Sequence, residues 1–250
     1  MSVFRFKQFD VVNEDSAMKV NTDGVLLGAA MTVRPEDRSF LDVGTGTGTI
    51  ALMTAQRIGG LLSEDGADRN ASGIRIYAID IDAPSATEAA INFRRSPWST
   101  ILHASSMSLD EYAESAPDAV FDLIFSNPPY FESSLPAPQE RRNAARHTSA
   151  LSYRELLDFA SARLTPQGRI SMVLPADQEA GLCRHARMCG LHLFRILRVR
   201  TVPRKMPSRI IAEFSRSRCQ QPVEELLTIQ DEGKYTEEYL SLTRDFYLFA

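Results

Sequence analysis

The sequence lacks the features that mark membrane-spanning and secreted proteins. No segment approaches the roughly 18 consecutive apolar residues that a membrane-spanning helix needs. Residues 1–7 are not followed by the long apolar run of a secretory signal. These absences argue against a transmembrane or exported protein, and we expect a cytoplasmic one.

Cysteine is also scarce. The chain has three cysteines, Cys183, Cys189 and Cys219, an odd number without the paired CxxC spacing typical of zinc sites and redox motifs. We expect reduced, partly buried thiols and predict no metal. A chain of 250 residues can bury a stable core without disulfides but is short for two full domains. A single monomeric domain over residues 1–250 is therefore predicted.

A surplus of positive charge is missing, because the net charge is −4. Binding to nucleic acid depends on Lys and Arg neutralising phosphates, so the total argues against a polyanionic partner. The distribution argues the other way, since residues 184–218 contain ten Lys or Arg and only one acid, Glu213. A phosphate-binding surface and an ordinary solvated face are equally good interpretations of this stretch.

Apolar runs alternate with helical segments along the chain. The patterns predict strands at 39–43, 74–79, 100–104, 121–125, 168–174, 193–202 and 210–215, and helices at 50–58, 83–95, 153–164 and 177–189. Residues 59–73 have the composition of a linker, and 131–149 that of a long loop. Such alternation predicts an α/β fold whose mainly parallel sheet is covered on both faces. A ligand is expected beyond the carboxyl ends of its strands.

A glycine turn follows the first predicted strand, from Asp42 to Gly48. Its glycines, Gly44, Gly46 and Gly48, permit positive φ and let a ligand approach the backbone. The spacing is GxGxG rather than the GxGxxG of dinucleotide-binding folds. Asp80 ends the second predicted strand, where a carboxylate can accept hydrogen bonds from both hydroxyls of a ribose. Each feature alone also suits a simple strand–helix turn or a solvated acid, but together they predict a ribose-containing ligand.

The decisive motif is Asn127-Pro128-Pro129-Tyr130, at the end of the fourth predicted strand. The prolines stiffen the turn, so the Asn127 side-chain oxygen and the Pro128 carbonyl can act as fixed acceptors. Two acceptors suit an NH2 group, and accepting both hydrogens of an adenine amino nitrogen favours a pyramidal, more nucleophilic nitrogen. Tyr130 and Phe131 offer planar faces on which an extruded base can stack. The alternative is a proline-rich strand end with core aromatics.

These motifs resemble those of class I S-adenosylmethionine-dependent methyltransferases with an N/D-PP-Y/F motif, which act on amino nitrogens of adenine, cytosine or glutamine. Residues 4–9, Phe-Arg-Phe-Lys-Gln-Phe, and residues 17–29 are similar to the opening of the tRNA1(Val) adenosine-37 N6-methyltransferases. The similarity extends from Phe4 to about Tyr130, with a looser match beyond. The resemblance implies a Rossmann-like class I fold, with a seven-stranded sheet and an antiparallel last strand.

The resemblance also implies a set of cofactor-binding residues. Residues 1–38 would close over the cofactor and 39–250 would form the Rossmann-like core. The glycines would line the methionine end, Asp80 the ribose and Ile81 the adenine, whose amino edge would lie near two serines at positions where relatives carry an acid. The full set is Thr22, Asp23, Asp42, Gly44, Gly46, Gly48, Asp80, Ile81, Ser105, Ser106 and Asn127. Without the resemblance, Thr22 and Asp23 would simply begin a helix or turn.

The expected reaction is direct methyl transfer to N6 of a tRNA adenine, without a metal or a covalent enzyme intermediate. The target base would be flipped onto Tyr130 and held by Asn127 and Pro128. Candidate contacts to tRNA phosphates are Arg141, Arg142, Arg146, His147, Arg200, Arg204, Lys205 and Arg209. Three rivals remain: a protein-glutamine N5-methyltransferase, a DNA adenine methyltransferase, and a nucleotide-binding protein or oxidoreductase of another class.

Overall fold

The fold is built on one large sheet. The computed structural model describes residues 2–64, 73–129 and 151–250. Eight strands in these residues form the order β10-β8-β9-β7-β6-β3-β4-β5, and only β9 runs antiparallel to its neighbours. In chain order the strands are β3 (Ser39–Val43), β4 (Arg75–Asp80), β5 (Leu102–Ser106), β6 (Phe121–Ser126), β7 (Leu164–Pro175), β8 (His192–Arg200), β9 (Arg209–Ser215) and β10 (Val223–Thr228).

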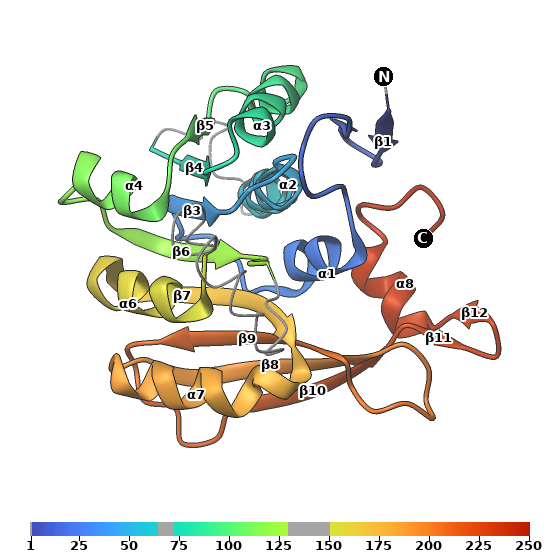
Figure 1. Cartoon of the computed structure of the whole chain (residues 1–250). Helices are drawn as coiled ribbons and strands as arrows, with labels where there is room; N and C mark the ends of the chain where they lie inside the picture. Colours follow the sequence, from blue (N-terminus) through green and yellow to red (C-terminus); the bar gives the residue numbers. More distant parts are fainter. Residues whose placement is uncertain (1, 65–72, 130–150) are drawn as a thin grey trace, which may run out of the picture.

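Helices cover both faces of this sheet (Figure 1). One face carries α1 (Thr22–Ala30), α2 (Thr49–Glu64), α3 (Ala83–Arg95) and α8 (Glu237–Thr243). The other carries α4 (Leu109–Ser115), α6 (Tyr153–Arg163) and α7 (Glu179–Met188), which the 3-10 turn η1 (Ala176–Gln178) precedes. In β6, Leu123 and Phe125 join the first core and Ile124 the second. Burial on both faces explains why such strands appear as continuous apolar runs in the sequence.

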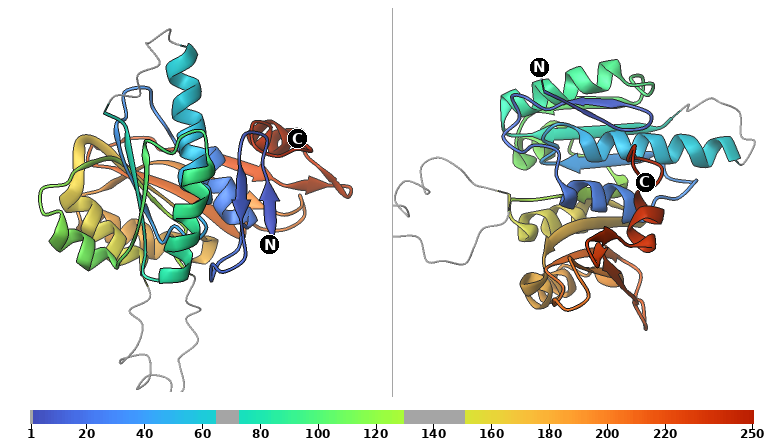
Figure 2. Two further views of the ribbon diagram at one scale, coloured as in Figure 1. Left: turned by 90° about the horizontal axis from the view of Figure 1, so that it is seen from above. Right: turned by 90° about the vertical axis from the view of Figure 1, so that its right-hand side faces the viewer.

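The two ends of the chain lie together beside α1 (Figure 2). A hairpin of β1 (Val3–Arg5) and β2 (Asp10–Val12) precedes α1, and β11 (Gln230–Asp231) and β12 (Lys234–Tyr235) precede α8. The Lys7 amide donates to Phe246 O at 2.8 Å, and the rings of Phe6 and Tyr247 stack with centroids 6.0 Å apart. No helix in the described parts of the chain combines the length and apolar character needed to traverse a bilayer.

The fold class predicted from the sequence is correct, but the structure differs from the prediction in two details. The sheet has eight strands rather than seven, because β10 extends it beyond β8. Most of β10 is exposed, and two of its residues, Glu224 and Glu225, pair with arginines of β8, so it lacks the apolar pattern of the other strands. Residues 59–64 are helical and not linker, since α2 continues to Glu64, while 65–72 lie outside the described residues.

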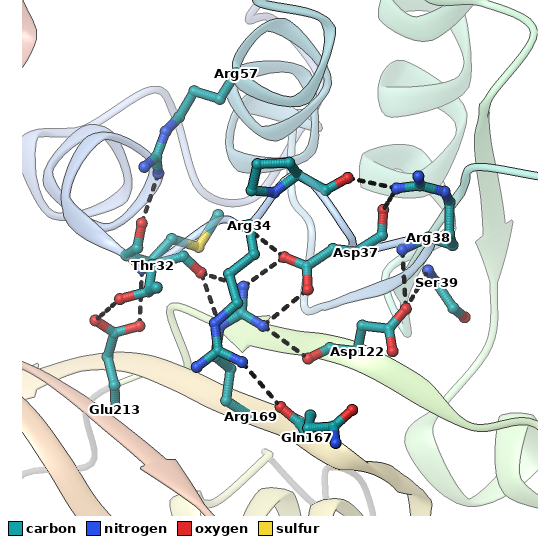
Figure 3. A network of polar contacts seen from close by, with 12 residues as sticks. Thr32, Arg34, Asp37, Arg38, Ser39, Arg57, Asp122, Gln167, Arg169 and Glu213 are labelled. Atoms are coloured by element: carbon teal, nitrogen blue, oxygen red, sulfur yellow. Dashed lines mark hydrogen bonds and ion pairs between the residues drawn. The ribbon is translucent and has the colours of Figure 1, made fainter. Parts of the chain in front are cut away.

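A buried polar network fixes the connection between α1 and β3 (Figure 3). Arg169 of β7 is fully buried and donates to both carboxylate oxygens of Asp37, at 2.9 and 2.5 Å, and to Thr32 O. Glu213 of β9, also fully buried, accepts from the amide and hydroxyl of Thr32 at 2.8 and 2.9 Å. Buried charges are tolerated when they are paired and hydrogen-bonded, as these are. The network thereby anchors the segment that leads into β3.

Replacing Arg169 by Ala should therefore destabilise the protein strongly. The change leaves the buried Asp37 carboxylate unpaired, and breaking a buried pair costs about 3–5 kcal/mol. Urea denaturation gives the free energy of unfolding. The matched control is Arg198→Ala, which removes partly exposed bridges to Glu179 and Glu224 and should cost no more than about 1 kcal/mol. Equal losses in the two variants would contradict this role of Arg169.

Candidate functional site

The ends of three adjacent strands form one cavity. β3 lies between β4 and β6, and the three strands are parallel. Their carboxyl ends therefore meet at the same edge of the sheet. A cavity of about 280 Å³ opens there, and the predicted site residues that line it are Gly44, Gly46, Asp80, Ile81, Asn127 and Pro129. The structure thus brings together the glycine turn, the strand-end acid and the Asn-Pro-Pro motif.

The glycine turn has the backbone conformation that its sequence predicts. Gly44, Gly46 and Gly48 have φ values of 71°, 56° and 81°, in the region that favours glycine. The amides of Gly44 and Thr45 both donate to Ile79 O, which folds the turn onto the end of β4. Gly48 lies behind the cavity, where an added Cβ would come within 2.5 Å of the Phe93 ring. Its lack of a side chain therefore serves packing against α3.

Asp80 is held in place by two backbone donors. The Gly46 amide donates to its Oδ2 at 2.8 Å and the Asp82 amide to its Oδ1 at 2.9 Å. Burial raises the pKa of the Asp80 carboxyl above its ordinary value. The carboxyl group lines the cavity beside the glycine turn. It is consequently a preoriented acceptor at the position where a ribose was expected.

Asp42 has a different position from the one expected of a cofactor ligand. It lies in β3 with no exposed surface, and burial raises the pKa of its carboxyl to about 7. The Thr45 hydroxyl donates to its Oδ2 at 2.7 Å. Asp42 is not among the described residues that line the cavity. Its carboxyl group supports the glycine turn from inside the protein.

Asn127 follows β6 and is 7% exposed. Its amide nitrogen donates to Asn21 Oδ1 at 3.5 Å and to Met18 Sδ at 3.6 Å. Both partners belong to the segment before α1, so this segment orients the amide. Pro128 is buried and is not among the described residues that line the cavity, whereas Pro129 is exposed and lines it. Tyr130, the last residue of the motif, lies outside the described residues.

Part of the cavity wall is apolar and consists of residues that follow β4 and β5. Ile81, Met107 and Leu109 line it, and Ile81 is 61% exposed, as expected for a residue facing an open cavity. Ser105 and Ser106 belong to β5 and are not among the described lining residues. The Met107 amide instead donates to Asp80 O at 3.0 Å, which places the residues after β5 against the cavity.

Among the lining residues that the sequence did not predict are two acidic residues on helices, Asp110 and Glu155. Asp110 lies in the first turn of α4, whose N-cap is Ser108, and Glu155 lies in the first turn of α6, whose N-cap is Ser152. The Ser-x-x-Glu pattern at residues 108–111 and 152–155 is a capping signal that could have located both helix starts.

Two polar side chains of α3 hold the N-terminal segment over the glycine turn. The buried Glu88 carboxylate accepts from three successive amides, those of residues 14–16, at 2.7, 2.9 and 3.0 Å. Asn92 donates to both Val12 O and Thr47 O, at 3.0 and 2.9 Å. This anchoring leaves Ala17 and Met18 in the wall of the cavity. In the sequence, Glu88 and Asn92 are marked only by their positions on an amphipathic helix.

Thr22 and Asp23 begin α1, one residue after the N-cap Asn21. They are not among the described residues that line the cavity. The Asp23 carboxylate accepts from Arg209 Nε at 2.8 Å, which joins α1 to the start of β9. Asn21, the N-cap residue before them, accepts a hydrogen bond from the Asn127 amide.

Four of the predicted basic residues, Arg200, Arg204, Lys205 and Arg209, belong to the described part of the chain and lie at the same edge of the sheet. β7 runs parallel to β6, and β9 runs antiparallel to both β7 and β8. β8 therefore runs in the same direction as β6. The connection from β8 to β9 is therefore at the cavity edge, and its Arg204 and Lys205 are exposed. Arg200 donates to Thr228 Oγ1 and Pro203 O. The others, Arg141, Arg142, Arg146 and His147, lie outside the described residues.

The chain is similar in fold to a solved structure and in sequence to a family model. A predicted O-methyltransferase from Agrobacterium tumefaciens, solved by crystallography, matches 90% of this chain and 96% of its own with a TM-score of 0.60 and 15% identity, which shows the fold. Residues 27–193 match the family described as RMKL-like, methyltransferase domain.

Two curated relatives match nearly the whole sequence. The protein of Bacteroides fragilis strain ATCC 25285 is 40% identical over 98% of this chain and 97% of its own, and that of Photobacterium profundum is 37% identical over 98% of each. Both are named tRNA1(Val) (adenine(37)-N6)-methyltransferase. The chain therefore belongs to the family of the tRNA1(Val) (adenine(37)-N6)-methyltransferases.

Proposed function

We propose that the protein methylates the N6 amino group of adenosine-37 in a valine tRNA, with S-adenosylmethionine as the methyl donor. The observation that carries the proposal is the single cavity shared by Asn127, the glycine turn and Asp80. A single small molecule in this cavity could then contact both Asn127, the proposed acceptor for the amino group, and Asp80, the proposed ribose-binding acid. The names of relatives about 40% identical over nearly the full chain support tRNA as the substrate.

The residues around the cavity fit S-adenosylmethionine. The backbone of Gly44 and Gly46 lines one part, the Asp80 carboxylate lies beside it, and the side chains of Ile81 and Met107 form an apolar wall. We assign the methionine part of the cofactor to the glycine turn, the ribose to Asp80 and the adenine to the apolar wall. Bound there, the cofactor supplies an electrophilic methyl group on a sulfonium.

Asn127 and Pro128 activate the target nitrogen in this proposal. The lone pair of an adenine amino group is delocalised into the ring, so the group is a poor nucleophile. Acceptance of its two hydrogens by the Asn127 side-chain oxygen and the Pro128 carbonyl favours a pyramidal nitrogen whose lone pair can attack. Because Asn21 and Met18 orient the Asn127 amide, little reorganisation is needed during the reaction. The proton of the product amine leaves to water.

The adenine reaches this position by flipping out of the anticodon loop. Its stacking partner in the proposal is Tyr130, which would contribute about 1–3 kcal/mol by comparison with other base-stacking sites. Positioning of N6 in line with the methyl group then accounts for much of the rate. The exposed Arg204 and Lys205, at the same edge of the sheet, are suited to contact the surrounding phosphates.

The N-terminal segment completes the site. We propose that residues 1–38 act as a cofactor-closing segment on a Rossmann-like core of residues 39–250. Anchoring of residues 12–16 by Glu88 and Asn92, which leaves Ala17 and Met18 at the cavity, supports this division. We further propose that the enzyme acts as a monomer in the cytoplasm, where its tRNA substrate is found.

Transfer to defined substrates tests the proposed function. Protein incubated with methyl-labelled cofactor and separate pools of tRNA, DNA and protein should label tRNA alone, as N6-methyladenosine. A valine tRNA transcript with adenosine-37 replaced by guanosine is the matched control and should remain unlabelled. Label in the protein pool alone would identify a glutamine methyltransferase, and label in none of the pools would favour a non-catalytic binding protein.

Asn127→Ala should reduce transfer strongly while leaving most of the cofactor affinity intact. Removal of one preorganised polar group from a reacting centre costs about 100- to 1,000-fold in turnover. The matched variant Asn127→Asp keeps oxygen acceptors and should retain more activity than the alanine variant. Calorimetry with S-adenosylhomocysteine should give nearly unchanged affinities for both. Lost cofactor affinity with retained turnover would refute the assigned role.

Replacement of both Arg204 and Lys205 by Ala should weaken tRNA binding in a salt-dependent way. Each phosphate contact contributes about 1 to the slope of log affinity against log salt, so the slope should fall by about 2. The matched control replaces Arg94 and Arg95, exposed neighbours at the end of α3. An unchanged slope in the first variant, or an equal fall in the control, would remove these residues from the tRNA interface.

A further inference from the structure

Three side chains with metal-binding atoms converge between α6 and α7, two helices that lie side by side on one face of the sheet (Figure 1). The Oδ1 atom of Asp158 lies 2.9 Å from His185 Nε2 and 3.0 Å from Cys189 Sγ. The three atoms all lie within 4.8 Å of one another. None of these residues is among the described residues that line the methyl-transfer cavity.

The backbone explains why these atoms meet. His185 and Cys189 are four residues apart at the end of α7, so their side chains share one face of the helix. Asp158 approaches this face from the middle of α6. The carbonyl end of a helix carries partial negative charge, which favours a cation there. Both α7 side chains are partly buried, while the Asp158 side chain is 62% exposed, so an ion has access from solvent.

We propose that Asp158, His185 and Cys189 form a binding site for Zn²⁺, with water as the fourth ligand. Imidazole, thiolate and carboxylate are the ligands that this ion takes in proteins, in tetrahedral geometry. A single oxygen of Asp158 already faces both the imidazole nitrogen and the thiol sulfur. The ion therefore needs no rearrangement of the helices to reach all three atoms.

Binding replaces protons by the metal. The Cys189 thiol loses its proton to solvent and bonds through sulfur, while the imidazole of His185 bonds through Nε2 and carries its proton on Nδ1. Because the ion competes with a proton for the Cys189 sulfur, its affinity should increase with pH.

The site has a structural role rather than a part in methyl transfer. Asp158 lies one turn after Glu155, whose side chain lines the cavity at the start of α6. An ion that joins α6 to α7 thus restrains the helix that carries a wall of the cavity. The expectation of metal-free methyl-transfer chemistry is unaffected.

Titration with Co²⁺ as a spectroscopic probe tests the site. The full-length protein, freed of metal with a chelator and kept reduced, should bind one equivalent of Co²⁺ with a near-ultraviolet thiolate-to-metal band, and Zn²⁺ should displace it. Cys189→Ser should remove this band, and His185→Gln should lower the affinity by at least roughly tenfold. Cys183→Ser, on the same helix but outside the cluster, is the matched control and should bind as the unaltered protein does.

Two further readouts keep the test decisive. Zn²⁺ should raise the midpoint of thermal unfolding of the unaltered protein and of Cys183→Ser, but not that of His185→Gln. Circular dichroism establishes that each variant is folded, so that a lost band reports a lost ligand. Absence of a one-equivalent band in the unaltered protein, or full binding by Cys189→Ser, would overturn the proposal and leave the cluster as a hydrogen-bonded contact between the two helices.

Discussion

The position of β3 between two parallel neighbours is the constraint on which the site depends. Its register sets Val43 opposite Ile79 of β4 and Asp42 opposite Phe125 of β6. The residues that follow these positions therefore emerge side by side at one edge of the sheet, although together they span about 80 residues of the sequence. The glycine turn, Asp80 and Asn127 lie together because each is at the end of one of three adjacent strands. The proposed methyl transfer depends on this adjacency.

Buried polar groups then fix the segments that the sheet alone does not position. Glu88 and Asn92 tie the N-terminal segment to α3, and Arg169 ties the connection before β3 to β7. A buried polar group without a hydrogen-bond partner costs free energy, so these contacts favour one arrangement of the chain. The cavity is consequently built from loops that are held by specific hydrogen bonds as well as by apolar packing.

A structural feature can be predicted from the sequence when its signal lies within the segment itself. The strand at 39–43 and the helix at 83–95 match the structure, since a short apolar run and an amphipathic period are properties of the segment itself. β10 was missed because its stability comes from pairing with β8 and not from its own apolar pattern. The cavity wall after β5 was placed at Ser105 and Ser106, whereas Met107 and Leu109 line it.

A crystal structure of the protein with S-adenosylhomocysteine would test the assigned site most directly. The cofactor product should lie in the cavity at the ends of β3, β4 and β6, with its ribose hydroxyls on Asp80 and its sulfur directed toward Asn127. Binding at any other place, or a cofactor whose sulfur points away from Asn127, would contradict the proposal that one cavity holds both the methyl donor and Asn127.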